Sequence, residues 1–447
     1  MNRKKQGPVA RGQGPVKAFD STLDPRPRTL DPESASPDPG PRTLDPLKIL
    51  MLAPTPYFSD RGCHVRIFEE AQALMQQGHQ VRIVTYHLGR DLPPVPVDRT
   101  VMVPWYRKQG AGPSWHKPYL DLLLIGKALT VARSFRPHLI HAHLHEGALV
   151  GWVLKQLLRV PLLFDYQGSL SGESLNHGFF KNGLLLHRLF CAIERTINHL
   201  PDRIISSSTP GQQELIEQWG IEATKVSALP DGVDTGIFCP FPKEAAHHCL
   251  IKYLAPCPLT LDPASPVPVI IYLGLLNRYQ GIDLLLEAAR ELVRRGCSFH
   301  LLLMGFPDEA YRSKAAEMGL SGQVSFTGRI DYADAPLLLC AGDIAVSPKI
   351  SSTEANGKLL NYMACGLPVV CFETPVNREL LGNDGIYATF GDAVHLADRL
   401  AAALSEQEGL HLRGERLRQR AVQHHDWHSR AAQLEELYSK MLLPPFP

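Results

Sequence analysis

Strand and helix signals alternate along most of this 447-residue chain. Residues 48–53 (KILMLA), 138–143 (HLIHAH), 161–166 (PLLFDY) and 203–208 (RIISSS) are short apolar runs that predict strands, and helical patterns separate them. Consecutive parallel strands need a crossover of this kind. The alternation therefore predicts a parallel sheet covered by helices.

The same alternation starts again in the second half of the chain. Residues 269–274 (VIIYLG) predict a strand, 282–296 a helix, and 299–305, 323–328 and 343–348 further strands. Two doubly wound domains of the Rossmann type present the carboxyl ends of their strands to a central cleft, where such folds bind ligands. We therefore expect an α/β fold with its functional site between two domains.

Two proline-rich stretches divide the chain. The tetrapeptide TLDP occurs three times within residues 1–46 and again at 260–263. A segment of this composition buries too little apolar surface to offset its chain entropy. We predict five parts: a disordered tail at 1–46, a first domain at 47–240, a linker with a Pro-rich insertion at 241–267, a second domain at 268–425 and a C-terminal helix at 426–447.

The composition argues against several classes of protein. The net charge is +1, so a nucleic-acid partner is not expected. The nine cysteines form no CxxC pair and no Cys/His cluster, which argues against a disulfide framework and favours a reducing cytoplasm. No apolar run reaches membrane-spanning length, and no apolar core follows the basic N-terminus as in a signal peptide. We expect a cytoplasmic protein that is soluble or at most peripheral to a membrane.

The stretch SPKISSTEANGKLLNYMACGLPVV (347–370) places Lys349 and Lys358 beside the predicted start of an apolar helix, with Asn361 in its first turn. A helix N-terminus carries unsatisfied N–H groups and partial positive charge, so cations beside it favour a phosphate. Taken alone, the stretch fits an ordinary solvated loop equally well.

Each half also has a glycine-containing loop after its first strand, at 59–62 and 274–281. Neither loop reads GxGxxG, and neither carries the lysine of a Walker loop. Dinucleotide-binding and P-loop sites are therefore disfavoured, and simple turns are an alternative.

Three histidines alternate in HAHLHEG (141–147), and we expect His141, His143 and His145 to share one strand face. His143, at the carboxyl end of the predicted strand, is best placed to form a hydrogen bond with a ligand. Zinc binding and core packing are the alternatives for this group.

In their order and spacing these motifs resemble glycosyltransferase family 4, whose members have the GT-B fold. The resemblance extends over residues 47–440 and rests on PTPYFSDRGCHVRIFEEAQALMQQGHQV, RPHLIHAHLHEG, ALPDGVDTGIF, VIIYLG with YQGIDLLLEAA, VSFTG, and GKLLNYMACGLPVV. It implies that the second domain binds a nucleotide-diphosphate sugar and the first binds the acceptor. It also implies retention of anomeric configuration, no metal or other cofactor, and a final helix that crosses back to the first domain.

The resemblance further implies roles for individual residues. Gly62 would let backbone N–H groups approach the donor, and His143 would contact the transferring sugar. The loop before the GKLLNYMA helix would hold the donor sugar and diphosphate. We thus predict His143 and Glu354 as catalytic, Gln167 and Ser169 on the acceptor side, no metal ligand, and a donor-binding set of Gly62, Gly274, Asn277, Arg278, Lys349, Ser351, Thr353, Asn356, Gly357, Lys358 and Asn361.

The chain departs from the family pattern at several positions. Thr353 and Asn361 stand where the family has two glutamates, with Glu354 one position late. Leu275 and Gln280 stand where the family has an arginine and a lysine. The remaining departures are Asp231 for asparagine and Gln167 for histidine.

Lys349 and Lys358 offer a replacement for the missing cationic pair. A diphosphate leaving group develops negative charge, and without a metal a positive side chain must stabilise it. We therefore predict that these two lysines do so.

Other functions stay open at this point. A nucleotide-sugar 2-epimerase would share the two-domain cleft, a non-catalytic nucleotide-sugar-binding protein would tolerate the departures, and a metal-dependent hydrolase could be built on HAHLHE. Residues 177–197 have an apolar face with Lys181 and Arg188, which fits a helix on a membrane that presents a lipid-linked acceptor, or a helix packed beside the cleft. The acceptor of a transferase could equally be a glycan or a small molecule.

Overall fold

The computed structural model describes six stretches of the chain: 45–59, 62–108, 114–176, 185–254, 267–351 and 354–442. All but the last two residues of the predicted tail at 1–46 lie outside them, as do the Pro-rich patch at 255–266 and residues 177–184 of the predicted apolar segment.

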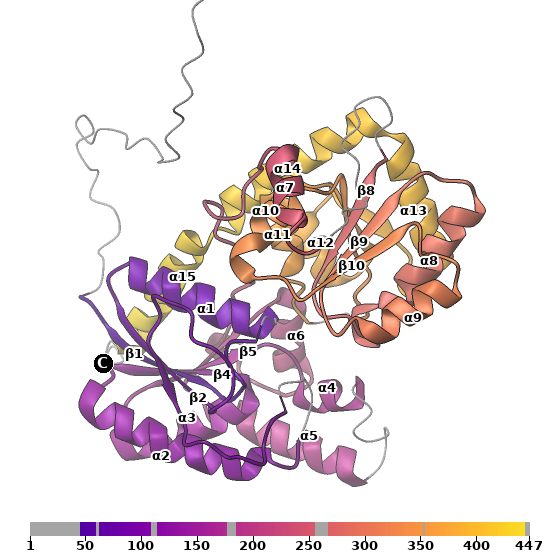
Figure 1. Ribbon diagram of the computed structural model, residues 1–447. Coiled ribbons are helices and arrows are strands. Elements are labelled where there is room, and N and C mark those ends of the chain that lie inside the picture. Colours follow the sequence, from indigo (N-terminus) through magenta and orange to yellow (C-terminus); the bar gives the residue numbers. More distant parts are fainter. Residues whose placement is uncertain are drawn as a thin grey trace, which may run out of the picture. The chain divides into compact units, whose positions relative to one another are not determined.

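The first half of the chain forms a parallel seven-stranded sheet (Figure 1). Its central strands are apolar runs buried on both faces, as expected for a sheet with helices on each side. In spatial order the strands are β3 (Val97–Arg99), β2 (Gln80–Thr85), β1 (Lys48–Ala53), β4 (Leu139–His143), β5 (Leu162–Tyr166), β6 (Arg203–Ser206) and β7 (Val226–Ala228).

The second half forms a parallel six-stranded sheet. Its strands, in spatial order, are β10 (Val324–Gly328), β9 (His300–Met304), β8 (Val269–Leu273), β11 (Ile344–Ser347), β12 (Val369–Phe372) and β13 (Ile386–Ala388). In both sheets the strand order reverses at the first strand, β1 or β8, which is the doubly wound arrangement. The predicted α/β fold with two Rossmann-like domains is confirmed.

Helices cover both faces of the first sheet (Figure 1). Helix α1 packs on one face and helices α2 and α3 on the other, so two apolar cores lie on opposite sides of the sheet. The helices of this half are α1 (Gly62–Gln76), α2 (Lys117–Phe135), α3 (Leu144–Leu158), α4 (Leu170–Asn176), α5 (Leu185–Asn198) and α6 (Thr209–Glu217).

The second sheet is likewise enclosed by two apolar cores. Helix α7 lies within the predicted linker, and its Ala246 and Leu250 belong to one of these cores. The remaining helices are α7 (Lys243–Leu250), α8 (Ile282–Arg294), α9 (Glu309–Glu317), α10 (Ala335–Leu339), α11 (Lys358–Ala364), α12 (Pro375–Leu381), α13 (Ala393–Ser405), α14 (Gln407–His424) and α15 (Trp427–Leu442). In the described part of the chain, none of the helices combines the length and apolarity that crossing a bilayer requires.

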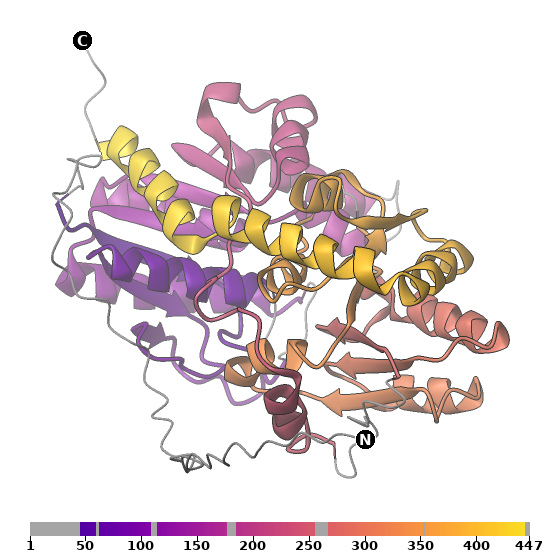
Figure 2. The ribbon, with the colours of Figure 1, turned by 90° about the horizontal axis from the view of Figure 1, so that it is seen from above.

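The last two helices join the two halves (Figure 2). Leu417 and Ala421 of α14 pack in a core of the second half. Helix α15 instead buries Trp427, Leu434 and Tyr438 in the core that holds α1 and β1. An isolated helix of this length is marginal in water, so this apolar contact is what stabilises α15.

A buried carboxyl group, Glu69 of α1, ties three elements together. The Trp427 indole N–H donates to Glu69 Oε2 at 2.7 Å, and the Tyr332 hydroxyl donates to Oε1. Tyr332 lies in the 3₁₀ turn η3 (Tyr332–Asp334) of the second half. Burial raises the pKa of Glu69 to about 8, although these two hydrogen bonds act in the opposite direction.

The raised pKa of Glu69 predicts that stability falls as pH rises from about 4.5 to about 8. Between the ordinary value of 4.5 and about 8 the folded state holds a proton that the unfolded state has lost, so stability decreases as pH rises through this window. Each pH unit costs up to about 1.4 kcal/mol. Melting temperatures from pH 5 to pH 8 should drop for the wild type and stay flatter for Glu69→Gln, which cannot ionise. A Glu69→Gln profile parallel to that of the wild type would contradict this origin.

Candidate functional site

A cavity of about 210 Å³ lies between the two halves, beside the carboxyl end of β8 and the start of α1. One wall comes from α1 and the segment 231–238, and the other from the loop after β8, the turn η3 and the segment before α11. Several predicted donor-binding residues line it together: Gly62, Gly274, Lys349, Asn356, Gly357, Lys358 and Asn361.

Lys358 is the first residue of α11, and its ammonium group lies at the cavity wall. Its Nζ donates to Gln280 Oε1 at 2.6 Å and to the Tyr272 hydroxyl at 2.9 Å. Both partners are neutral. Burial, and then the nearby charge of Lys349, lower the pKa of Lys358 well below its ordinary value. A bound anion would favour the charged form of this side chain.

Helix α11 has seven residues, which is about two turns. Its dipole is therefore smaller than that of a long helix. The phosphate site expected from the sequence consequently depends on the lysines more than on the helix.

Lys349 lies in the same loop, lines the same cavity and is buried. Its Nζ donates to the Ala355 carbonyl oxygen at 2.6 Å and lies 3.4 Å from Glu354 Oε2. The Tyr279 hydroxyl donates to the same carboxylate oxygen. Glu354, predicted as catalytic, thus points to Tyr279 and Lys349 and does not line the cavity.

The loop before α11 is fixed by buried contacts. Asn356 donates through Nδ2 to Ser347 Oγ at 3.1 Å and to Asn377 Oδ1 at 3.0 Å. At Gly281 the backbone has a φ of 74°, and a Cβ there would lie 1.9 Å from the Pro348 carbonyl oxygen, so only glycine fits. These contacts hold the strand-end loops of β8 and β11 against each other.

Three predicted donor-binding residues lie away from the cavity lining. Asn277 caps the short 3₁₀ turn η2 (Arg278–Gln280) by accepting from the Gln280 N–H at 2.8 Å. Arg278 is exposed, and Ser351 Oγ accepts from the Glu354 N–H at 3.2 Å. Thr353 lies outside the described residues.

His143 ends β4, as predicted, but it is fully buried and does not line the cavity. Its Nδ1 lies 2.9 Å from Asp165 Oδ2, and Gln167 donates to the same oxygen at 2.7 Å. Burial, and then the charge of His141, lower the pKa of His143 despite this contact. Ser169 donates to Glu194 Oε2 at 3.1 Å and is also held within the first half.

The expectation that three histidines share one strand face is wrong for His145. Strand β4 ends at His143, and Leu144 has a φ of 63°, which turns the chain into α3. His145 therefore lies on a helix, where its Nε2 is 3.5 Å from Glu194 Oε1. A residue in the left-handed region cannot continue a strand.

The residue that sequence reasoning missed is Arg66 of α1. Its side chain is 3% exposed and forms a bidentate ion pair with Asp165. Arg66 Nε donates to Asp165 Oδ2 at 2.8 Å, and Nη2 donates to Oδ1 at 2.9 Å. Its Nη1 also donates to Asp231 Oδ1 at 2.6 Å. Burial acts to raise the pKa of Asp165, but Arg66 and His143 outweigh it and hold that pKa below the usual range. Burial raises the pKa of Asp231, although Arg66 opposes it.

Arg66 links the histidine to the cavity. Arg66 and Asp231 both line the cavity, whereas Asp165 contacts His143 behind it. Across the cavity, a Cβ on Gly357 would lie 2.9 Å from Asp231 Oδ2, so the carboxylate closely approaches the loop of Lys349 and Lys358. One signal for this network was in the sequence: a charged residue on the apolar side of an amphipathic helix.

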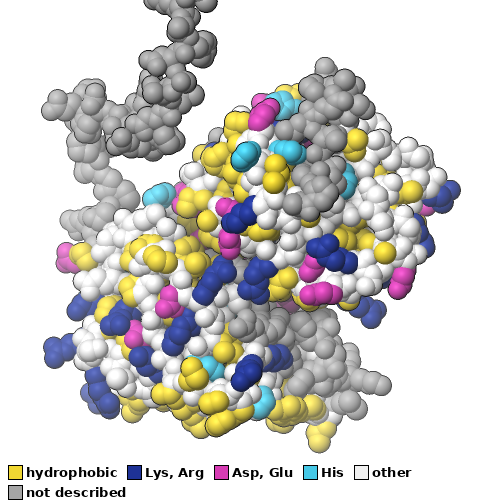
Figure 3. Space-filling view, viewed as in Figure 1, with side chains coloured by type: hydrophobic (Ala, Val, Ile, Leu, Met, Phe, Trp, Pro, Cys, Tyr) yellow, Lys and Arg dark blue, Asp and Glu magenta, His cyan; other side chains and the backbone are white. Residues whose placement is uncertain are grey.

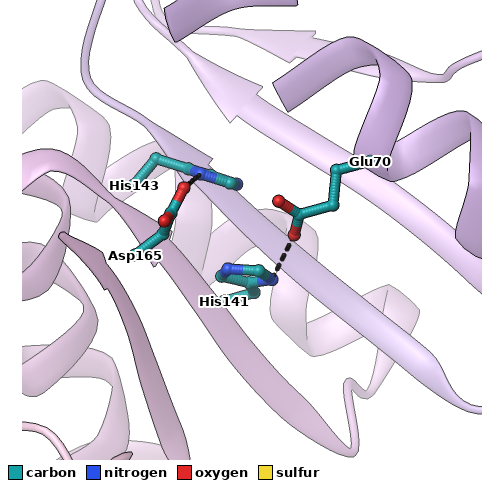
Figure 4. A group of neighbouring side chains, drawn as sticks. All are labelled: Glu70, His141, His143 and Asp165. Carbon is teal, nitrogen blue, oxygen red and sulfur yellow. Dashed lines mark hydrogen bonds and ion pairs between the residues drawn. The ribbon is translucent and has the colours of Figure 1, made fainter. Parts of the chain in front are cut away.

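Glu70, His141, His143 and Asp165 form a buried group of the residue types that bind metals (Figure 4). His141 Nδ1 lies 3.0 Å from Glu70 Oε1 and 2.8 Å from the Tyr438 hydroxyl oxygen. The two imidazole rings stack 4.6 Å apart with 20° between their planes. A metal is bound in the plane of each ring, and stacked rings do not converge on one ion. The arrangement fits hydrogen-bonded pairs better than a metal centre.

Removing the guanidinium should cost far more than removing one of its partners. Arg66→Met leaves Asp165 and Asp231 buried without their cation, and breaking a buried pair in this way costs about 3–5 kcal/mol. Asp231→Asn keeps a hydrogen-bond acceptor for Arg66 and should cost less than about 1.5 kcal/mol. Urea unfolding measures both. Equal, small losses would show that the pairing is not formed in solution.

Two family models match the chain. Residues 61–232 match the model described as a glycosyl transferase 4-like domain, and residues 267–406 match the model described as glycosyl transferases group 1. Together these segments make up more than half of the chain. A D-inositol 3-phosphate glycosyltransferase of Nocardia farcinica is 25% identical over 406 residues, which cover 85% of each chain.

Two solved structures share the fold. Sucrose-phosphate synthase of Thermosynechococcus elongatus has a TM-score of 0.73 at 19% identity, covering 88% of this chain and 99% of that one. Anabaena HepE, solved in complex with UDP-glucose, has a TM-score of 0.68 at 19% identity, covering 88% and 100%. The matched models, the relative and the two shared sheets agree with the resemblance inferred from the motifs, and the chain belongs to glycosyltransferase family 4 as a divergent member with the GT-B fold.

Proposed function

We propose that this protein transfers a sugar, with retention of configuration, from a nucleotide-diphosphate sugar to a glycan, lipid-linked or small-molecule acceptor. The observation that carries the proposal is the pair Lys349 and Lys358 in the wall of one cavity between two Rossmann-like sheets. Ligands of doubly wound folds bind at this edge of the sheet.

Such a reaction must stabilise the negative charge that develops on the leaving group. The acceptor hydroxyl attacks C1 of the sugar on the face from which the diphosphate leaves, and the hydroxyl proton passes to the departing phosphate oxygen. Negative charge then grows on the diphosphate, and preorganised cations lower the barrier. Lys358 sits between Gln280 and Tyr272, and Gln280 occupies a position where the family has lysine.

The similar proteins suggest which donor and which acceptor to test first. HepE is solved with UDP-glucose, so a uridine-diphosphate sugar is the first donor to test. The D-inositol 3-phosphate glycosyltransferases point to a polar acceptor as one candidate. The assignment of catalysis to His143 and Glu354, and of acceptor contacts to Gln167 and Ser169, stays a prediction.

The proposed reaction needs no cofactor beyond the donor and no metal, since the lysines supply the positive charge. We further propose that it takes place in the cytoplasm, because the cysteines are odd in number and their spacing is unlike the disulfide framework of a small secreted domain.

A non-catalytic nucleotide-sugar-binding protein is the second candidate. The observation that favours it is Leu275, which lines the cavity where the family has an arginine. An apolar side chain there contributes nothing to diphosphate binding. The two candidates differ in turnover alone.

Loss of the Lys358 ammonium should weaken binding of the diphosphate selectively. Charged hydrogen bonds contribute about 1.5–3 kcal/mol, so Lys358→Ala should weaken UDP binding by roughly ten- to a hundredfold while uridine binding changes little. Calorimetric titration measures both. Lys314→Ala on α9, which is not among the lining residues of the cavity, is the matched control and should bind UDP like the wild type. Equal loss of UDP and uridine binding would instead indicate a folding defect.

Product analysis separates the candidates. With UDP-, GDP-, ADP- and TDP-sugars and an acceptor panel, a transferase gives a glycosylated product with the donor's anomeric configuration, and an excess of chelator should leave the rate unchanged. Epimerised donor without acceptor would identify a 2-epimerase. Saturable donor binding without turnover on any acceptor would favour the binding protein.

A further inference from the structure

Helices α2, α3 and α5 form the outer layer on one side of the first sheet (Figure 1), and each of them exposes large apolar side chains. On α5 the stripe Leu185, Leu189 and Ile193 is 84%, 53% and 41% exposed. Leu122 of α2 and Leu157 of α3 are exposed as well. Figure 3 shows hydrophobic side chains along the lower edge of the half that holds these helices. We call this outward side the α2–α3–α5 face.

The described residues before α2, at 100–108 and 114–116, extend this apolar character. Met102, Trp105 and Trp115 are each more than two-thirds exposed. The Tyr106 ring packs 5.5 Å from the His116 ring, which precedes α2, so the segment 100–108 adjoins the N-terminal end of that helix. Large exposed apolar patches on a soluble domain mark interaction sites, and tryptophan favours the boundary between water and lipid.

The exposed charged side chains on the three helices and at their C-caps are all positive. Among the described residues of the three helices, the carboxylates are Asp121, Glu146 and Glu194, and each is engaged: by Tyr86, by Lys117, and by Ser171 with the Leu170 N–H. The exposed charged residues on these helices and at their C-caps are Arg133, Arg136, Arg159, Arg188 and Arg195. A surface with apolar stripes, exposed arginines and engaged carboxylates complements a negatively charged apolar boundary.

We propose that the α2–α3–α5 face, with Met102, Trp105 and Trp115 beside it, docks on an anionic lipid bilayer. Leucine and tryptophan side chains enter the boundary between headgroups and acyl chains, and arginines contact lipid phosphates. The small net charge of the whole chain, +1, does not oppose this, because the attraction is local and acts within a Debye length.

The topology places this surface next to the cleft. A helix that follows a parallel strand starts at the strand's carboxyl edge, so the N-terminal ends of α2 and α3 lie at the edge where the cavity opens. Trp105, Trp115 and Leu185 precede or begin helices at this edge. On the proposed transferase function, docking there would bring an acceptor held in the bilayer to the cavity, and this last step alone depends on that function.

Vesicle co-sedimentation of the full chain tests the docking. Wild-type protein should bind vesicles of phosphatidylcholine with phosphatidylglycerol, bind pure phosphatidylcholine at least roughly fivefold less, and dissociate in high salt. Leu189→Ser and Arg188→Glu should each weaken binding by roughly fivefold or more.

Matched controls carry the same changes elsewhere. Leu412 of α14 is 54% exposed against 53% for Leu189, so Leu412→Ser controls for loss of an exposed leucine. Arg290→Glu on α8, also exposed, controls for charge reversal. Both controls should bind vesicles like the wild type. Melting temperatures and the UDP-induced thermal shift should be unchanged in all four variants, because none of these residues lines the cavity.

Three results would overturn the docking proposal: no binding of the wild type to anionic vesicles, equal binding to neutral ones, or equal loss in the control variants. A dimer that Leu189→Ser converts to monomer, without vesicle binding, would assign the face to a second copy of the chain. Failure of the donor experiments leaves the vesicle result intact, so the two proposals fail separately.

Discussion

A single buried guanidinium, that of Arg66, organises the centre of the first half. It joins α1 to Asp165 at the end of β5 and to Asp231 beyond β7, so one side chain holds three segments that meet beside the cavity. Two aspartates share one arginine in a buried place, and such a cluster is stable only while its geometry is kept. His143 then receives its orientation from Asp165.

The two C-terminal helices connect the two halves beside this centre. Helix α14 packs in the second half and α15 in the first, with Glu69 bonded to Trp427 of α15 and to Tyr332 of the second half. Glu69, Tyr332 and Trp427 all line the cavity. The contact that joins the halves is therefore also part of the cavity wall, and ligand binding and the junction of the halves are expected to influence each other.

Much of this architecture is local in origin and was accessible from the pattern of residues. Strands β1, β4 and β8 and helix α8 follow from runs whose periodicity lies within six to fifteen residues. Strands β3, β7 and β13 escaped prediction because three residues carry no period. The loop with Lys349 and Lys358 was recognised as a candidate anion site from residue type and position, and both lysines do line the cavity.

What the sequence by itself determined is thus the alternation of strands and helices, the family, and the lysines that line the cavity. The tertiary structure alone decided which charges meet. Arg66 pairs with Asp165 and Asp231, which lie 99 and 165 positions further along the chain. Glu354 contacts Tyr279, and His145 lies on a helix instead of on β4. The spacing of apolar residues along a helix or strand indicates which of its sides is buried, because that spacing is set by residues within one or two turns. The partner of a buried charge depends on how distant segments close on one another, and no local pattern encodes that.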